Sequence, residues 1–463
     1  MSFDADLFKV AEHESVKTAL EKIDHHHQGF ILTVDDSDAV KGLVTDGDIR
    51  RALIRGVDLN DPISEVANAD FIWVTKDTPR EVILKKLDSE IRFIPVLNTK
   101  RELHYVITRD FMPLREEKSV YVRARAPVRV SFGGGGSDLT HYFTDNPGAV
   151  INAAISVYSH ATMKLRSDKK INIHSLDLDA ELSIDCIDHA IQNPGKFGLV
   201  LAVLQVVKPT FGFDLFMHSD FPVGSGLGGS AAVSAVILGC LNMFRQDQWD
   251  KHELAEIAFQ AERLNLGIAG GWQDQYACVF GGFNFIEFKK DQNIVHPIRI
   301  NDDTLLELEE SLVLCDTGIS HHSGNVHDQQ KVTMMSNDVS KMVKENVELT
   351  YLMRNYLLRG HLTEFGYGLD KAWQLKRNFG EMITSDVIDK IYSDALKNGA
   401  IGGKLLGAGG GGFFLFSVSP FKKNGLIKHL RSKGLQIKNF RFEENGLQSW
   451  SVRDHESDTE YKD

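Results

Sequence analysis

The sequence has few cysteines, no excess of basic residues and no long apolar run. Its four cysteines, Cys186, Cys240, Cys278 and Cys315, are far apart and form no CxxC pair. This spacing excludes a disulfide framework and a cysteine zinc site, and it fits a reducing cytoplasm. Lysine and arginine number 52 against 64 acidic residues, a net charge of −12, so the basic surface typical of a nucleic-acid-binding protein is missing. No run of 18 apolar residues occurs, and Met1–Val10 lacks the basic residues followed by an apolar stretch that begin a signal peptide. We therefore expect a cytoplasmic protein without a membrane segment.

Glycine, by contrast, is abundant and unevenly distributed. The 463 residues include 39 glycines, and the length predicts two or three domains. Residues 1–115 hold few of them, whereas four dense clusters follow, at 133–136, 224–229, 267–271 and 407–412. The charged stretch after Pro113 predicts a solvated linker at 113–120 between a first domain and the glycine-rich remainder.

The first 115 residues are predicted to contain two copies of one small unit. Copy one has a helix over 15–23, strands over 29–34 and 42–45, and a helix from Asp46. Copy two repeats this order with a helix over 79–87, strands over 92–97 and 103–108, and a short helical stretch over 109–112. In each copy a threonine followed by an acidic residue opens the last helix.

This arrangement resembles a pair of CBS domains, tandem modules that often bind adenine nucleotides. Copy one carries Gly42-Leu43-Val44-Thr45-Asp46-Gly47-Asp48-Ile49, which matches the family's ribose and phosphate motif. The resemblance implies nucleotide contacts from Thr45 and Asp48. The alternative is that these two residues only cap a helix. Copy two is one residue shorter between Thr108 and Asp110, so its match to the motif is weaker.

The second glycine cluster is the clearest ligand-binding pattern. It joins Gly224, Ser225, Gly226, Leu227, Gly228, Gly229, Ser230 and Ala231 to an apolar helix over 233–241. A glycine-rich loop that leads into a helix N-terminus presents free N–H groups and the positive end of the helix dipole to an anion. Those groups suit a triphosphate, and the Ser230 hydroxyl could ligate Mg²⁺. No Gly-Lys-Ser/Thr follows, so the loop is not a Walker A motif; a plain glycine turn before a buried helix is the alternative.

The other glycine clusters carry isolated polar residues whose orientation the sequence leaves open. Gly136 precedes Ser137 and Asp138, and Gly402–Gly412 leads into an apolar strand over 413–418. Glu262 borders the apolar stripe of an amphipathic helix, where it could face a site or solvent. Asp274 follows a double glycine and could equally be a turn or cap residue.

Taken together, the clusters resemble the three motifs of the GHMP kinase superfamily (galactokinase, homoserine kinase, mevalonate kinase and phosphomevalonate kinase). The motifs occur in order over about 340 residues: Ala126-Pro127-Val128-Arg129 through Ser137-Asp138, then Pro222 through Ala232, then Leu406 through Phe414. The resemblance implies an α/β (α+β), two-lobed kinase fold that binds ATP and Mg²⁺. It assigns Ser230 and Glu262 to the metal, Asp274 to the catalytic base and Arg129 to the cation paired with that base. It implies substrate contacts from Asp138, Gly136, Ser137, Gly271, Thr317 and Gly409.

Within the superfamily the chain is most similar to D-glycero-D-manno-heptose 7-phosphate kinases. Gly-Gly-Trp-Gln-Asp-Gln at 270–275 and Lys-Leu-Leu-Gly-Ala-Gly-Gly-Gly-Gly at 404–412 match their motifs. The resemblance implies phosphorylation of the anomeric hydroxyl of a sugar phosphate, to the 1,7-bisphosphate, for nucleotide-activated heptose and surface glycans. Two departures stand out. Gly135 replaces the acidic sugar contact of galactokinases, and His321 and His322 occupy the place where the heptose kinases carry an arginine.

The expected organisation is a CBS pair over 1–115, an ATP-binding lobe over 121–330, a second lobe over 331–453 with helices near 331–358 and 384–398, and a disordered tail over 454–463. Two other activities stay open: a kinase of another sugar such as a fucose-like hexose, and a nucleotide-binding regulatory protein with an inactive kinase fold. A third alternative joins them, an active kinase gated by an adenine nucleotide at the CBS pair. Association into a homodimer is expected only by analogy with other CBS pairs.

Overall fold

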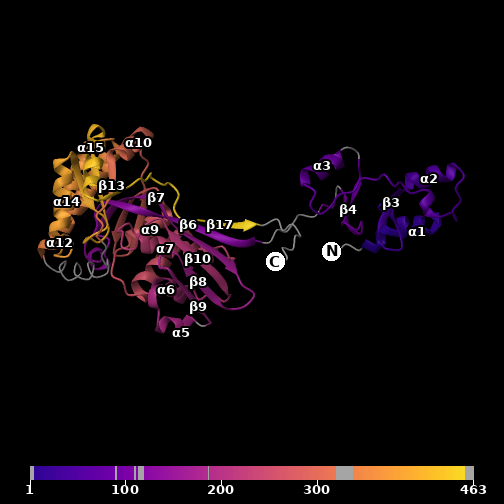
Figure 1. The fold of residues 1–463 in the computed structure, drawn as a ribbon, viewed down its shortest axis with the longest axis horizontal. Coiled ribbons are helices and arrows are strands. Elements are labelled where there is room, and N and C mark those ends of the chain that lie inside the picture. Colours follow the sequence, from indigo (N-terminus) through magenta and orange to yellow (C-terminus); the bar gives the residue numbers. More distant parts are fainter. Residues whose placement is uncertain are drawn as a thin grey trace. The chain divides into compact units, whose positions relative to one another are not determined.

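The computed structural model describes residues 5–88, 91–108, 111–112, 119–185, 187–319 and 337–453. The chain divides into two compact units, Met1–Glu116 and Glu117–Asp463, which are described separately (Figure 1). Several predicted features lie outside the described residues: Cys186, the first half of the helical stretch predicted at 109–112, the linker core at 113–118, His321 and His322, and the tail at 454–463. The other half, 111–112, is not helical.

The first unit contains the predicted repeat. Its elements are η1 (Ala5–Phe8), β1 (Lys9–Ala11), α1 (Val16–His26), β2 (Phe30–Val34), β3 (Val40–Thr45), α2 (Asp46–Ile54), η2 (Ile63–Glu65), α3 (Arg80–Asp88), β4 (Phe93–Leu97) and β5 (Leu103–Thr108). The order helix, strand, strand therefore occurs twice, as the sequence predicts. Strands β1, β2 and β3 form one sheet and β4 and β5 another. The rings of Phe30 and Phe93 stack at 4.0 Å, so the two copies share an apolar core.

The larger sheet of the second unit has two of the glycine clusters, at 133–136 and 224–229, after its strands β6 and β10. Its order is β12-β11-β7-β10-β8-β9, with β6 beside β7 and β17 beside β6. The strands are β6 (Ser119–Gly133), β7 (Gly148–Leu165), β8 (Ile171–Ser175), β9 (Ala180–Ile184), β10 (Phe213–Ser219), β11 (Phe283–Lys289), β12 (Gln292–Pro297) and β17 (Gln448–Arg453). Its helices are α4 (Thr140–Phe143), α5 (Ile187–Gln192), η3 (Gly195–Phe197), α6 (Gly198–Val207), α7 (Gly229–Asn242), α8 (Lys251–Phe259), the π-helix η4 (Gln260–Asn265) and α9 (Gln273–Phe280). Helix α7 packs on β6 and β7, with α6 and α9 beside it.

A smaller sheet has the order β14-β15-β13-β16. It consists of β13 (Leu312–Asp316), β14 (Ala400–Leu405), β15 (Phe413–Val418) and β16 (Gln436–Lys438), with α10 (Asp302–Ser311), α12 (Asn337–Leu358), α13 (Leu362–Lys376), α14 (Asp386–Lys397) and α15 (Pro420–Ser432). The helices gather around this sheet in Figure 1. Helices α12 and α14 match the two predicted helices. No helix in the described ranges is long and apolar enough to cross a membrane.

Two strands lie in a different sheet from the one that the predicted lobe boundaries imply. Strand β13 precedes residue 330 but pairs with β15 in the smaller sheet, and β17 follows it but pairs with β6 in the larger one. The two sheets share one core, in which Phe132 of β6 packs edge-on against Phe365 of α13 at 5.2 Å. The junction of the two sheets is therefore a rigid support for a site.

Candidate active site

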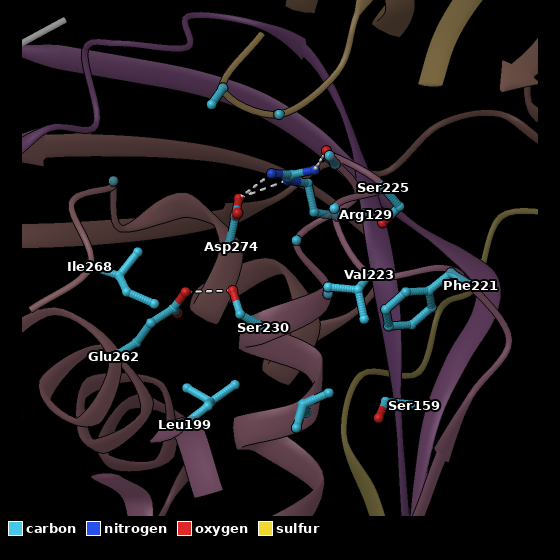
Figure 2. A pocket seen from close by; sticks show the side chains of 18 of the residues that line it. Arg129, Ser159, Leu199, Phe221, Val223, Ser225, Ser230, Glu262, Ile268 and Asp274 are labelled. Carbon is cyan, nitrogen blue, oxygen red and sulfur yellow. Dashed lines mark hydrogen bonds and ion pairs between the residues drawn. The ribbon is translucent and has the colours of Figure 1, made fainter. Parts of the chain in front are cut away.

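Four glycine-rich segments meet around one cavity at this junction. The cavity has a volume of about 540 Å³, within the range of small-molecule sites. Its glycine lining comes from all four segments: Gly135, Gly136, Gly224, Gly226, Gly228, Gly229, Gly271 and Gly407. Figure 2 shows Asp274 and Arg129 joined on one side of it, and Ser230 and Glu262 joined on another.

The loop at 224–228 requires glycine for its backbone conformation. Gly224, Gly226 and Gly228 have φ of 78°, 73° and 79°, a left-handed region that side chains disfavour. Gly228 ends the loop as the N-cap of α7 without a side-chain cap, so the first N–H groups of the helix remain available to an anion. A Cβ on Gly226 would stand 2.9 Å from the Leu406 carbonyl oxygen, because the second and fourth segments pack backbone against backbone. Leu227 and Ala231 are themselves fully buried behind the loop.

Ser230 and Glu262, which are predicted to hold a metal ion, are in contact with each other. The Ser230 hydroxyl donates a hydrogen bond to Glu262 Oε1, and Gln275 Nε2 donates to Glu262 Oε2 at 2.7 Å. Glu262 is 1% exposed, so its side chain faces the protein interior and not solvent. The π-helix η4 inserts an extra residue per turn here, a distortion common at functional sites. Hydroxyl and carboxylate oxygens suit Mg²⁺, which proteins often hold by one or two such groups plus substrate phosphates. The residues present therefore fit the ion.

Asp274 and Arg129 form a close ion pair. Arg129 Nε and Nη2 lie 2.7 and 2.6 Å from Asp274 Oδ1, and Nη1 donates to the Gly226 carbonyl at 2.8 Å. Arg129 is 2% exposed, whereas the Asp274 side chain is 19% exposed at the start of α9. Because both guanidinium nitrogens meet Oδ1, the other carboxylate oxygen is left to accept a bond from a substrate hydroxyl. Through Arg129, this arrangement also connects Asp274 to Gly226 in the loop at 224–228.

Asp138 forms a second buried acidic group of the cavity wall. It accepts hydrogen bonds from the Gly136 amide at 3.1 Å and from Gln273 Nε2 at 3.2 Å. Burial and then the nearby Asp274 carboxylate raise the pKa of Asp138. A Cβ on Gly271 would overlap the Asp138 carboxylate, so glycine is required there for packing. The Gln273 Oε1 atom is buried without a partner among the described residues.

Three predicted substrate contacts do not line the cavity. Ser137 is fully buried, and its hydroxyl donates to the Gly134 carbonyl at 2.7 Å. The Thr317 hydroxyl donates to the Gly412 carbonyl at 2.7 Å, and Gly409 packs against Ile383. In this structure these residues shape the glycine loops, and the cavity lining does not include them.

Two buried lysines line the cavity but were not predicted as site residues from the sequence. Lys376 ends α13 at 4% exposure, and its Nζ donates to the carbonyls of Leu405, at 3.3 Å, and Gly407. Lys404 on β14 is 1% exposed and donates to the Ser131 carbonyl at 2.7 Å. Burial and then the Arg129 charge lower the pKa of Lys376 to about 7; burial, then Lys376, lower the pKa of Lys404 far below its usual range. Lys404 begins the glycine-rich match at 404–412, but nothing local distinguishes Lys376 from surface lysines.

In the first unit Thr45 and Asp48 cap a helix, as one alternative predicts. The Thr45 hydroxyl accepts the Asp48 amide at 3.2 Å, and Asp48 Oδ2 accepts the Thr45 amide at 2.9 Å. Arg51 Nη2 lies 2.5 Å from Asp48 Oδ1. Partial burial acts to raise the pKa of Asp48. The hydrogen bonds from Thr45 and Arg51 act in the opposite direction and together have the larger effect, so the pKa is lowered.

Comparison with known proteins agrees with this geometry. The family model of the GHMP kinases N terminal domain matches residues 198–282, and that of the GHMP kinases C terminal matches 353–433. The chain is 34% identical over 342 residues to the D-glycero-alpha-D-manno-heptose 7-phosphate kinase of Campylobacter jejuni, covering 72% of this chain and 99% of that one. The chain belongs to the GHMP kinases. It is an ATP-dependent sugar kinase, and CBS domain models match residues 3–55 and 63–110 at its N-terminus.

Two further proteins are similar to this GHMP kinase, one by structure and one by sequence. A crystal structure of a D-glycero-D-manno-heptose 1-phosphate kinase from Bacteroides thetaiotaomicron superposes with a TM-score of 0.61 at 27% identity, covering 72% of this chain and all of that one. The L-fucokinase/L-fucose-1-P guanylyltransferase of Bacteroides fragilis is 26% identical over 324 residues, 63% of this chain and 34% of that protein. The kinase matches confirm the GHMP kinase fold, and the CBS domain matches confirm the CBS pair.

Proposed function

We propose that this kinase transfers the γ-phosphoryl group of ATP to the anomeric hydroxyl of D-glycero-D-manno-heptose 7-phosphate, giving the 1,7-bisphosphate in the cytoplasm for nucleotide-activated heptose and surface glycans. The observation that carries the proposal is the Asp274–Arg129 pair, placed in one cavity with the phosphate loop and Asp138. The heptose named in two relatives supports the sugar class.

In this proposal each side chain has a defined task. The loop at 224–228 and the N-terminus of α7 bind the phosphates of ATP, while Leu199, Phe221 and Val223 in the same lining offer apolar contact to its nucleoside. Mg²⁺, held by Ser230 and Glu262, would neutralise charge on the β- and γ-phosphates. Asp138 orients the sugar through its hydroxyls.

Asp274 then acts on the reacting hydroxyl. Its carboxylate accepts the proton as the sugar oxygen forms a bond to the γ-phosphorus and the bond from that phosphorus to ADP breaks. Arg129 fixes the orientation of the carboxylate by bonding Oδ1, and its positive charge offsets negative charge that develops on the phosphoryl oxygens.

A sugar panel tests the substrate. With Mg·ATP, we expect heptose 7-phosphate to give a kcat/KM about 10-fold or more above that of unphosphorylated heptose, L-fucose and D-galactose, since loss of one charged contact typically costs that much. Phosphorus NMR should place the new phosphate on the anomeric carbon. Efficient turnover of L-fucose with none of heptose 7-phosphate would instead support the fucose-like alternative, which the fucokinase relative favours.

For the first unit we propose binding of an adenine nucleotide that involves Thr45 and Asp48. Calorimetry with AMP on the full chain should show binding that Thr45→Val weakens about 10-fold, because a ligand bond and the helix cap are both lost. Ser15→Ala is the matched control, since Ser15 caps α1 in the same unit by accepting the Thr18 amide at 3.2 Å. The absence of heat in the wild type, or equal weakening in both variants, would show that Thr45 is only a cap residue.

A further inference from the structure

Lys376 is a cavity residue to which none of these roles gives a task. It is nearly fully buried, lines the cavity and comes from α13, on the opposite lobe from the phosphate loop. Its ammonium group donates to two backbone carbonyls, those of Leu405 and Gly407. An ammonium group has three donors, so one remains for a ligand.

The backbone around Lys376 places it beside the reacting groups. Gly407, which it holds, packs directly on Gly226 of the phosphate loop. The Gly226 carbonyl in turn accepts the Nη1 bond of Arg129. Lys376 is therefore connected to both the phosphate loop and the catalytic pair through one glycine contact.

The charges in the cavity wall leave Lys376 without a counter-ion. Arg129 is paired with Asp274, and the pKa of Asp138 is raised by burial and by Asp274, which favours its neutral form. Among the described residues no carboxylate lies within 4.0 Å of the Lys376 ammonium. Asp138 and Asp274 attract its charge only from farther away, and the Arg129 charge opposes it. A buried cation without a partner is costly, and an anionic ligand would relieve that cost.

We propose that Lys376 binds a phosphoryl group in this cavity, either the phosphate that the sugar carries or the phosphoryl group in transfer. The inference rests on the proposed function; in the first case Lys376 would make the enzyme prefer phosphorylated sugars. Lys376 holds the two carbonyls that fix its position and donates its third N–H to a phosphoryl oxygen.

Three variants of the full chain test this role. Lys376→Met keeps an unbranched side chain that lacks only the terminal ammonium group, and Lys376→Arg keeps a positive charge. Lys371→Met is the matched control, because Lys371 lies on the same helix but is half-exposed and pairs with Glu345 at 2.9 Å. Thermal unfolding of each variant reports any loss of fold.

The two phosphoryl sources give different kinetics. If the sugar's phosphate is bound, Lys376→Met raises KM for the phosphorylated sugar about 10-fold and leaves kcat and the KM of an unphosphorylated sugar unchanged. If the group in transfer is bound, kcat falls by a similar factor with every sugar. In both cases Lys376→Arg recovers part of the loss. Wild-type kinetics in folded Lys376→Met would overturn the inference.

The pH profile is an independent readout. The free Lys376 is cationic below its pKa of about 7, so kcat/KM in the wild type should decline as pH rises through 7. Lys376→Arg should move that decline to higher pH, because a guanidinium group stays charged. A purely structural lysine would leave the profile the same in both proteins.

A binding measurement separates this inference from the proposed substrate. Calorimetry with inorganic phosphate on the full chain needs no turnover, so it applies even if heptose 7-phosphate is not a substrate. We expect Lys376→Met to weaken phosphate binding about 10-fold and Lys371→Met to leave it unchanged. Failure of the sugar panel alone would reject the substrate, whereas equal phosphate binding in all three proteins would reject the role of Lys376.

Discussion

Replacement of Asp274 by asparagine is expected to lower kcat by about 100-fold or more, the lower end of what a general base contributes. Asparagine has nearly the same shape, and its carbonyl oxygen can still accept the Arg129 bonds now made at 2.6 and 2.7 Å. The amide cannot take up the proton of the sugar hydroxyl. The variant should therefore fold and bind nucleotide while losing turnover.

Steady-state kinetics with a sugar that the wild type phosphorylates measure this loss, and calorimetry with Mg·ADP checks the nucleotide site. Asp291→Asn is the control, because Asp291 is an exposed residue of the turn between β11 and β12. Turnover near that of the wild type in Asp274→Asn would remove the base from the mechanism. Unchanged KM values together with a low kcat would place its contribution in the transition state.

The sequence was sufficient for features that depend on local chemistry or on ordered motifs. The repeat in the first unit follows from alternating apolar residues and from caps such as Ser15 and Thr45. The four glycine clusters do converge, because each reverses the chain next to a strand or helix of the same core. Arg129, Asp138 and Asp274 line one cavity, as the family resemblance implies.

Features that depend on tertiary contacts were not predictable. The pairing of β17 with β6 joins residues more than 300 positions apart, and no local pattern specifies such a partner. The orientation of Glu262 depends on the π-helix η4, which an α-helical periodicity does not anticipate. Ser137 and Thr317 have hydroxyls typical of substrate contacts, yet these groups bond to backbone carbonyls in the loops. Lys376 becomes a cavity residue only because α13 packs on β14.

Glu262→Gln is expected to have the second large effect, on the dependence of activity on Mg²⁺. The variant keeps the volume of the side chain and can still accept from Ser230, but the charge that an oxygen-preferring cation requires is lost. We expect the Mg²⁺ concentration for half-maximal activity to rise about 100-fold or more, since loss of even an outer partner of a metal site costs up to that factor. Folding should be retained, because Ser230 and Arg263, which both bond to Glu262 Oε1, can bond to an amide oxygen in that position. Gln275, which donates to Oε2 at 2.7 Å, can turn its own amide so that its oxygen accepts from the new NH₂ group.

Titration of activity with Mg²⁺ at saturating ATP measures this shift. Glu256→Gln is the matched control, because Glu256 is an exposed glutamate on α8, the helix that precedes η4. Ser230→Ala should shift the same curve in the same direction, because both oxygens would ligate one ion. An unchanged Mg²⁺ dependence in Glu262→Gln would mean that the buried carboxylate only anchors Ser230 and Arg263, and the metal would then have to be held by the phosphates and Ser230. The two variants together therefore distinguish a ligand from a structural acid.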